Sequence, residues 1–191
     1  MLIIIKEIKK TARTDDGGLI LKCLGEDGKE IEIELSPEAA DTLRIAIEKL
    51  KRPWIRMAES IVKRLRDLLK ELFKKKGVEF EENTELFGLK IDVFKTRGSL
   101  LGPPEAYIFV PDIIDEDFVT TYDIVFNNEI RNERGIVCII IAAAATDSAI
   151  KKARKRVQVY DVYDARKGDG YDSPIIEVLA ESAFQIRFRR E

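Results

Sequence analysis

The sequence contains no histidine. This absence excludes serine-histidine and cysteine-histidine catalysis, and it excludes every metal site that depends on imidazole ligands. Any catalytic metal would have to be held by oxygen atoms, which favours Mg²⁺ or Mn²⁺ on carboxylates. Catalytic chemistry therefore has to be sought among the charged side chains.

Cysteine is scarce, and the two residues present, Cys23 and Cys138, lie far apart in apolar segments. We expect both to be buried thiols in a reducing compartment rather than a disulfide. The apolar run Met1–Ile5 has no basic leader and stops at Lys6, so it does not predict a signal peptide. The longer run Ile136–Ala145 is still shorter than the about 20 residues that span a bilayer. These features predict a cytoplasmic protein without membrane contact.

An excess of charge of one sign is also lacking. The net charge is -2, although 36% of the residues are charged, against about 25% in an average protein. Such a balance, with few Asn, Gln, Cys and Met residues, is typical of hyperthermophile proteins that depend on ion-pair networks. It provides no global basic field that would favour a nucleic acid or an anionic membrane.

The clearest structural signal is the uninterrupted apolar run Ile136–Ala145. Helix-capping residues follow at 146–148, then a short amphipathic helix, Ala149–Arg156, and a β-branched segment, Val157–Val162. A run of this kind predicts a strand that is covered on both faces. The fold class we predict is therefore α/β, with a mixed central sheet flanked by helices.

An N-terminal antiparallel β-meander plus helix is predicted to precede this core. The expected elements are strands at Leu2–Ile8, Leu19–Leu24 and Glu30–Leu35, and a helix from Pro37 to Leu50. The third strand alternates strictly between glutamates and aliphatic residues, which is typical of a sheet with one exposed face. We assign residues 1–52 to this part, 53–165 to the α/β core and 166–191 to a C-terminal strand extension.

The core itself begins with an amphipathic helix over Pro53–Lys76 that Gly77 should end. The other expected elements are strands at Val78–Phe80, Leu86–Phe94 and Ala106–Val110, loops at Asn83–Thr84 and Arg97–Pro104, a helix over Asp115–Glu133, and an alternating strand over Ser182–Arg189. The segment Asp115–Glu133 is also rich in β-branched residues, but its apolar side chains share a helical face.

Two stretches resemble a known family. Leu89–Phe94, with Asp92, is similar to the second strand of the restriction-endonuclease-like superfamily, the PD-(D/E)XK nucleases, and Ile136–Val162 resembles the closing strand-helix-strand of that fold. The order of elements over residues 53–163 also resembles this family, in particular the small RecB-type nuclease-like proteins of thermophilic archaea. Residues 1–50 and 165–191 lie outside the resemblance.

The resemblance implies a Mg²⁺ or Mn²⁺ site in which the metal activates water and stabilises charge on the scissile phosphate. Glu59 matches the family's helix glutamate and Asp92 its strand aspartate, and these two are the expected metal ligands. The third strand departs from the motif, because Val110 stands where the acid belongs and Asp112 where the lysine belongs.

Glu105 and Lys95 could replace the missing pair from neighbouring positions. The candidate catalytic set is therefore Glu59, Asp92, Glu105 and Lys95. A plainer interpretation makes Glu59 a surface acid that pairs with Lys63 one helical turn later, and Asp92 a strand-edge carboxylate.

Two basic clusters are candidate nucleic-acid contacts. They are Lys74, Lys75 and Lys76 at the end of the first core helix, and Lys152, Arg154, Lys155 and Arg156 between the last two core strands. Tyr160, Tyr163 and Tyr171 could stack bases beside the second cluster. The alternatives are a solvated helix end for the lysines and half-buried strand aromatics for the tyrosines.

The tripeptide Glu129-Ile130-Arg131 matches the family's glutamate-x-lysine motif, except that Arg replaces Lys. We discount this match, because the tripeptide lies in a predicted helix or turn.

Three functions remain open on the sequence. We favour a nuclease-like domain that lacks the full catalytic set and acts as a nucleic-acid-associated or assembly module, with DNA or RNA as partner. The enzyme alternative is a Mg²⁺- or Mn²⁺-dependent nuclease with a rearranged carboxylate site. The third is a protein-interaction or homodimerisation module that uses the edges of the N-terminal meander and the final strand.

Overall fold

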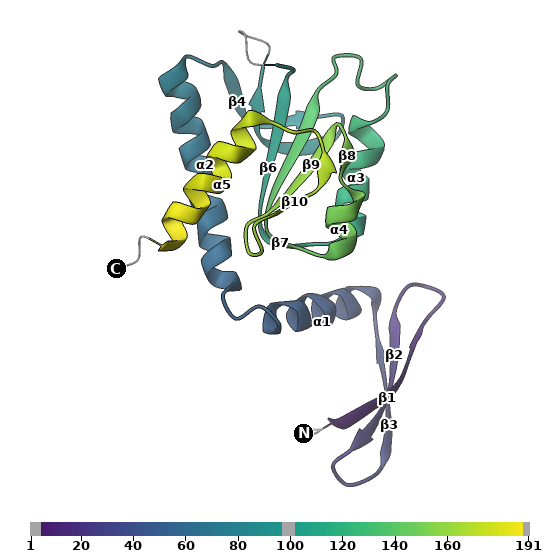
Figure 1. Cartoon of the computed structure of the whole chain (residues 1–191). Coiled ribbons are helices and arrows are strands. Elements are labelled where there is room, and N and C mark those ends of the chain that lie inside the picture. The colour runs from purple at the N-terminus through teal and green to yellow at the C-terminus, as the bar shows by residue number, and fades with distance from the viewer. Residues whose placement is uncertain (1–4, 97–101, 189–191) are drawn as a thin grey trace. The chain divides into compact units, whose positions relative to one another are not determined.

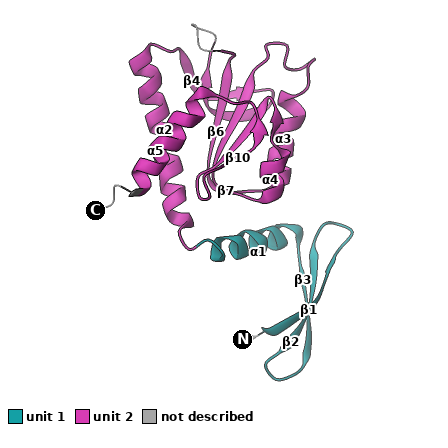
Figure 2. Ribbon diagram, in the orientation of Figure 1, with its two compact units in different colours: residues 1–52 teal, residues 53–191 magenta. Residues whose placement is uncertain are grey.

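The structure is a computed structural model that describes residues 5–96 and 102–188. It forms two compact units, residues 1–52 and residues 53–191 (Figure 2). No helix within the described ranges is long and apolar enough to cross a membrane. The predicted loop at Arg97–Pro104 falls largely outside these ranges.

The first unit is an antiparallel meander followed by one helix (Figure 1). Its elements are β1 (Ile5–Arg13), β2 (Leu19–Gly25), β3 (Glu30–Leu35) and α1 (Pro37–Leu50), with the strands in the order β1-β2-β3. Ser36 caps α1, because its hydroxyl accepts a hydrogen bond from the Ala39 N–H. The predicted meander and helix are confirmed, and residues 2–4 of the first expected strand lie outside the described part. Homodimerisation through the edges β1 and β3 stays a prediction.

The second unit is a mixed eight-stranded sheet packed with helices. Its helices are α2 (Ile55–Lys76), α3 (Glu116–Phe126), α4 (Asp147–Lys152) and α5 (Pro174–Phe188). Its strands are β4 (Phe80–Leu86), β5 (Leu89–Lys95), β6 (Glu105–Ile114), β7 (Val137–Ala145), β8 (Arg154–Lys155), β9 (Val157–Asp161), β10 (Arg166–Lys167) and β11 (Asp169–Gly170). The strand order is β11-β8-β9-β7-β6-β5-β4, and β10 pairs with β9.

Strand β7 is the centre of the fold, and every one of its residues is buried. Ile139 and Ile141 face α2 and α5, whereas Cys138 and Ile140 face α3 and α4. Both neighbours, β6 and β9, run parallel to β7. The predicted strand with two covered faces is therefore confirmed. The thiols of Cys23 and Cys138 are free and buried, which confirms the prediction of buried thiols.

The first core hairpin turns later than predicted. Asn83 and Thr84 lie within β4, and the turn consists of Phe87 and Gly88, which have φ values of 57° and 83°. Asn83 has a φ of 51°, a left-handed conformation that asparagine tolerates better than most residues, so the strand can continue through it. Asn83 therefore has the left-handed conformation that is typical of a turn, but it lies within β4 and does not end the strand.

The expected strand at Ser182–Arg189 is wrong, because the residues described there belong to α5. The alternation of Phe184, Ile186 and Phe188 occupies only the last turns of this helix. Among the residues of α5 whose burial is described, the buried side chains are Ile176, Leu179 and Ala183, which recur at helical spacing. The window from Ser182 was too short to show that period.

Helix α3 also ends earlier than expected, at Phe126, and residues 127–136 form an irregular turn. Asparagine side chains at 127, 128 and 132 hydrogen-bond the backbone in and around this turn. Such bonds compete with helical ones, which explains why the helix ends at Phe126.

Candidate functional site

Glu105 and Lys95 come together as an ion pair inside the protein. The antiparallel pairing of β5 and β6 places them opposite each other, with Lys95 Nζ 2.9 Å from Glu105 Oε2. Lys95 is 5% exposed and Glu105 1% exposed. The sequence placed these two residues in one site, but it gave no indication that they are buried.

The Glu105 carboxylate receives two further hydrogen bonds. The Tyr107 hydroxyl donates to Oε2, and Ser173 Oγ donates to Oε1 over 3.2 Å. Burial, reinforced by the negative charge of Glu105, raises the pKa of Tyr107 and of Tyr171, so both phenols remain protonated donors. Because Ser173 directly precedes α5, this network attaches the start of that helix to the sheet.

Asp92 is held separately from this pair. Its Oδ2 accepts a 2.8 Å hydrogen bond from the Phe109 N–H on β6, and its Oδ1 lies 3.5 Å from Nη1 of Arg66 on α2. Nη2 of Arg66 donates to Asn83 Oδ1 at 2.6 Å. A guanidinium therefore stands beside the carboxylate that the family resemblance assigns to a metal.

These residues do not fit a Mg²⁺ or Mn²⁺ site as they stand. Glu59 lies partly buried on α2, Asp92 binds Arg66, and Glu105 binds Lys95. Within residues 5–96 and 102–188, no three His, Cys, Asp or Glu side chains are grouped so that they could hold a metal ion. Arg66 was missed by the sequence analysis, although it lies two helical turns after Glu59, on the same side of α2.

We expect Mn²⁺ titrated into the protein at low salt to show no binding that depends on Asp92. The physical reason is that an Asp92 oxygen released to a metal would leave Arg66 or the Phe109 N–H without its acceptor. Calorimetry on the wild type beside Asp92→Asn measures this directly. Saturable Mn²⁺ binding by the wild type alone would contradict the expectation and favour the nuclease alternative.

The predicted basic residues differ in their exposure and in whether an acidic side chain pairs with them. Lys74, Lys75 and Lys76 are exposed on the last turn of α2. Lys152, by contrast, lies 3.5 Å from Glu116, and Arg154 holds the buried Asp123 through bonds of 3.0 and 2.7 Å. Arg154 lowers the pKa of Asp123, which therefore stays ionised and neutralises much of the arginine charge.

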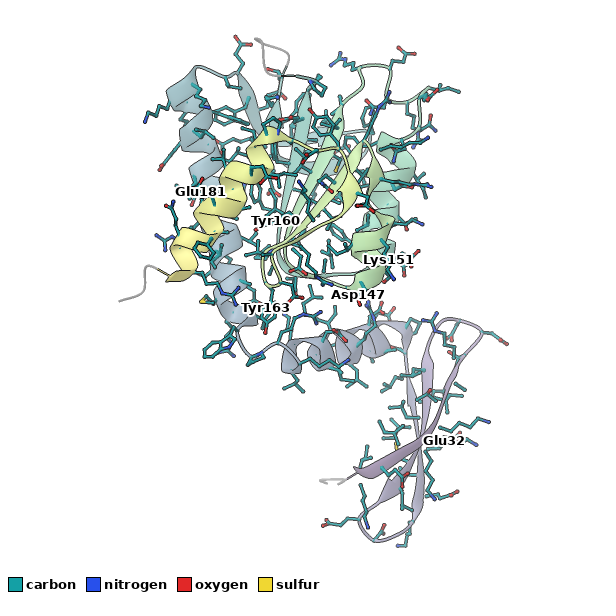
Figure 3. The ribbon with its side chains drawn as sticks, in the orientation of Figure 1. Glu32, Asp147, Lys151, Tyr160, Tyr163 and Glu181 are labelled. Carbon is teal, nitrogen blue, oxygen red and sulfur yellow. The ribbon has the colours of Figure 1, made fainter. Side chains whose placement is uncertain are left out.

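Most of the tyrosines that were predicted to stack bases pack in or against the hydrophobic core instead. Tyr160 is 5% exposed and lies inside the second unit (Figure 3), where burial raises its pKa. Tyr163 packs against the same core cluster, and Tyr171 lies near Glu105. Tyr160 in particular cannot stack a base, so the plainer interpretation of this residue is the correct one.

The irregular turn at 127–136 brings further arginines to this end of the sheet. Arg156 donates its backbone N–H to Asn127 Oδ1 at 3.0 Å, and its Nη1 lies 3.5 Å from the Asn132 carbonyl oxygen. Arg131 and Arg134 flank Asn132, are exposed, and form no side-chain ion pair with any described residue. The turn therefore carries two uncompensated arginines, and Arg156 links the turn to the predicted cluster at 152–156.

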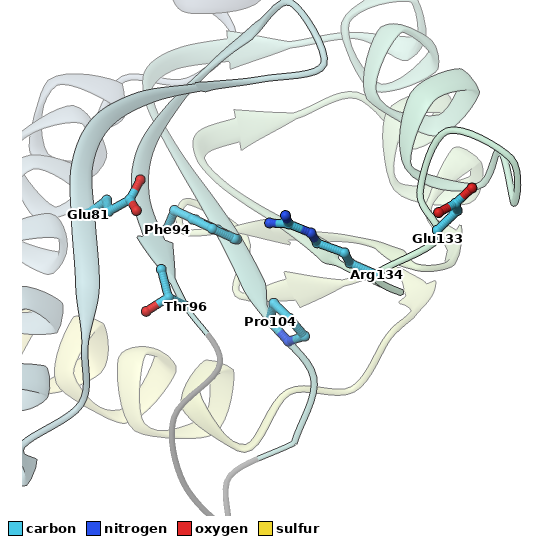
Figure 4. A pocket seen from close by; sticks show the side chains of 6 residues that line it. All are labelled: Glu81, Phe94, Thr96, Pro104, Glu133 and Arg134. Carbon is cyan, nitrogen blue, oxygen red and sulfur yellow. The ribbon is translucent and has the colours of Figure 1, made fainter.

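Arg134 also borders a cavity of about 570 Å³. The lining residues are Glu81, Phe94, Thr96, Pro104, Glu133 and Arg134. Figure 4 shows the Arg134 side chain extended toward Phe94 on β5, with Glu81 on the neighbouring strand β4, Thr96 directly after β5, and Glu133 directed away. The volume lies in the range of small-molecule sites.

A second hollow of about 170 Å³ adjoins the cavity and shares Glu133 and Arg134 with it. Its other lining residues include Arg131 and Phe87. The Phe87 ring is 37% exposed and packs edge-on against Phe126 at 5.7 Å. A bulky residue with positive φ is unusual in a turn, and such strain is often found at functional positions.

Sequence reasoning missed both hollows, because Arg131 lay in the segment predicted to be a helix, Asp115–Glu133, and Arg134 directly followed it. The one sequence feature that drew attention to Arg131 was the match of Glu129-Ile130-Arg131 to the family's glutamate-x-lysine motif, which we discounted as a catalytic motif. No family model, no curated protein and no solved structure matches the chain.

Proposed function

We propose that the chain is a nuclease-like α/β module that binds single-stranded nucleic acid and lacks a complete hydrolytic site. The observation that carries this proposal is the pair of adjoining hollows, which share Arg134 and place the 37% exposed ring of Phe87 beside Arg131. Proteins that bind single strands combine aromatic surfaces for the bases with cations for the backbone phosphates. Both kinds of group are present here within one continuous surface.

The order of elements supports the nuclease-like part of the proposal. From α2 to β7 the second unit runs helix, three strands, helix, strand, as in the family that Leu89–Phe94 and Ile136–Val162 resemble. Arg66 beside Asp92 and Lys95 beside Glu105 place cations where hydrolysis would need a metal and its ligands. Binding without cleavage is the function most consistent with this arrangement.

A single strand suits the surface better than a duplex. A base can enter a hollow only when it is unstacked and unpaired, which a loop or single strand allows. The net charge of -2 and the neutralised Lys152 and Arg154 leave few cations for the continuous phosphate contacts that a duplex offers. Arg131 and Arg134 provide about two such contacts.

Replacing both arginines with glutamine is expected to weaken binding of a short fluorescent oligothymidine about tenfold or more. Two lost phosphate contacts should also reduce the slope of log affinity against log salt by about 1.4, since each contact contributes about 0.7 on single strands. Fluorescence anisotropy at several salt concentrations measures both quantities.

The matched control removes two positive charges from the other predicted cluster. Lys74→Gln/Lys75→Gln should leave both affinity and salt slope close to those of the wild type, because these residues lie on the end of α2, outside either hollow. Equal weakening by the two double variants would show that only total charge matters. Absence of binding by the wild type would overturn the proposed function.

A further inference from the structure

The larger cavity offers a specific set of polar groups around an apolar floor. Phe94 and Pro104 are buried residues that line it, and Thr96 contributes a hydroxyl. The Glu81 carboxylate enters from β4 and the Arg134 guanidinium from the turn before β7, and neither makes a hydrogen bond or ion pair with any described residue. Acceptors and donors are therefore both available to a ligand.

We propose that this cavity takes one unpaired guanine base, with Glu81 as the residue that selects it. The inference rests on the proposed binding of single strands and adds the identity of the base. A carboxylate has two acceptor oxygens and no donor. Guanine is the base that presents two adjacent donors, N1–H and the N2 amino group, to such a pair of oxygens.

The other bases fit the carboxylate less well. Adenine and cytosine place a ring acceptor beside their amino group, so one carboxylate oxygen would face a lone pair. Uracil and thymine flank a single N–H with two carbonyl oxygens, which a carboxylate repels. A site whose polar group is left unpaired by the wrong ligand discriminates strongly against it.

The opposite edge of guanine complements the other wall of the cavity. Its O6 and N7 atoms are both acceptors, and arginine binds this pair with two parallel N–H donors. When a guanine occupies the cavity, Arg134 therefore binds the base, and Arg131 keeps its phosphate contact. Arg134 approaches Phe94 from the turn before β7, whereas Glu81 stands on β4, opposite Phe94 on β5. The base would lie between these two side chains, over the nearly buried Phe94 and Pro104 that form the floor of the cavity, with donors and acceptors on separate sides.

The test compares two oligothymidines, one with a single central guanine and the other with a central adenine, on three proteins. The wild type is expected to bind the guanine strand about tenfold or more tightly than the adenine strand, as a good bidentate contact provides. Glu81→Gln should reduce this preference to less than about threefold, because the amide replaces one acceptor with a donor. Glu85→Gln, at an exposed position on the same strand, should keep the preference.

The possible failures are distinguishable. Equal binding of both strands by the wild type overturns the guanine inference and leaves single-strand binding intact. If neither strand binds, the proposed function fails, and titration with guanosine and adenosine monophosphates decides the cavity by itself. Selective binding of the guanosine nucleotide that Glu81→Gln abolishes would then support the cavity, and its absence would overturn it.

Discussion

Replacing Lys95 with methionine is expected to lower the free energy of unfolding by about 3–5 kcal/mol, because it leaves a buried carboxylate without its cation. Glu105 is 1% exposed and cannot turn to water. The hydrogen bonds from Tyr107 and Ser173 would remain, but neither donor is charged. Urea denaturation measures the loss, and Lys90→Met, at an exposed position on the same strand, is the control that should change stability little.

A double variant separates the cost of the unpaired charge from the loss of packing. Lys95→Met/Glu105→Gln removes both charges and keeps an amide oxygen for the Tyr107 hydroxyl. Replacing both members of a buried ion pair is often close to neutral, so we expect the double variant to recover most of the stability. A double variant as unstable as Lys95→Met would show that the lysine acts through packing, and the ion-pair interpretation would be wrong.

The sequence predicted the elements whose burial is uniform over their whole length. Ile136–Ala145 has no polar residue, so its position between two helical layers followed from composition alone. The segment Ser182–Arg189 failed because a few residues of alternating pattern fit both a strand and the end of a helix. Only the spacing of Ile176, Leu179 and Ala183 distinguishes the two, and it lies mostly outside that window.

The candidate site was predicted less completely, for a different reason. The proximity of Lys95 and Glu105 was accessible from strand order, since the two residues flank one connection. Their burial depends on Ser173, which is distant in sequence and is brought over them by the segment before α5. The hollows depend on the turn at 127–136, whose shape is set by side-chain bonds to the backbone rather than by a periodic pattern.

Asn132 is the residue on which that turn depends most. It is 1% exposed and makes three hydrogen bonds to the backbone: its Nδ2 donates to the carbonyl oxygens of Phe126 and Ile136, and its Oδ1 accepts from the Ile136 N–H. These bonds hold together the two ends of the segment that carries Arg131 and Arg134. The position of both arginines, and with it the shape of the two hollows, therefore follows from one buried amide.

Asn132→Ala is accordingly expected to lower the free energy of unfolding by about 3 kcal/mol, because it leaves buried backbone groups unsatisfied. It should also weaken single-strand binding about tenfold at a temperature where the variant is folded, since two phosphate contacts lose their fixed positions. Asn128→Ala is the matched control for stability, because Asn128 is exposed and, among the described residues, its side chain accepts from the N–H groups of Ile130 and Arg131 at the surface. Full binding by folded Asn132→Ala would contradict the prediction, because Asn132 is too buried to touch a ligand and can act only by positioning the arginines.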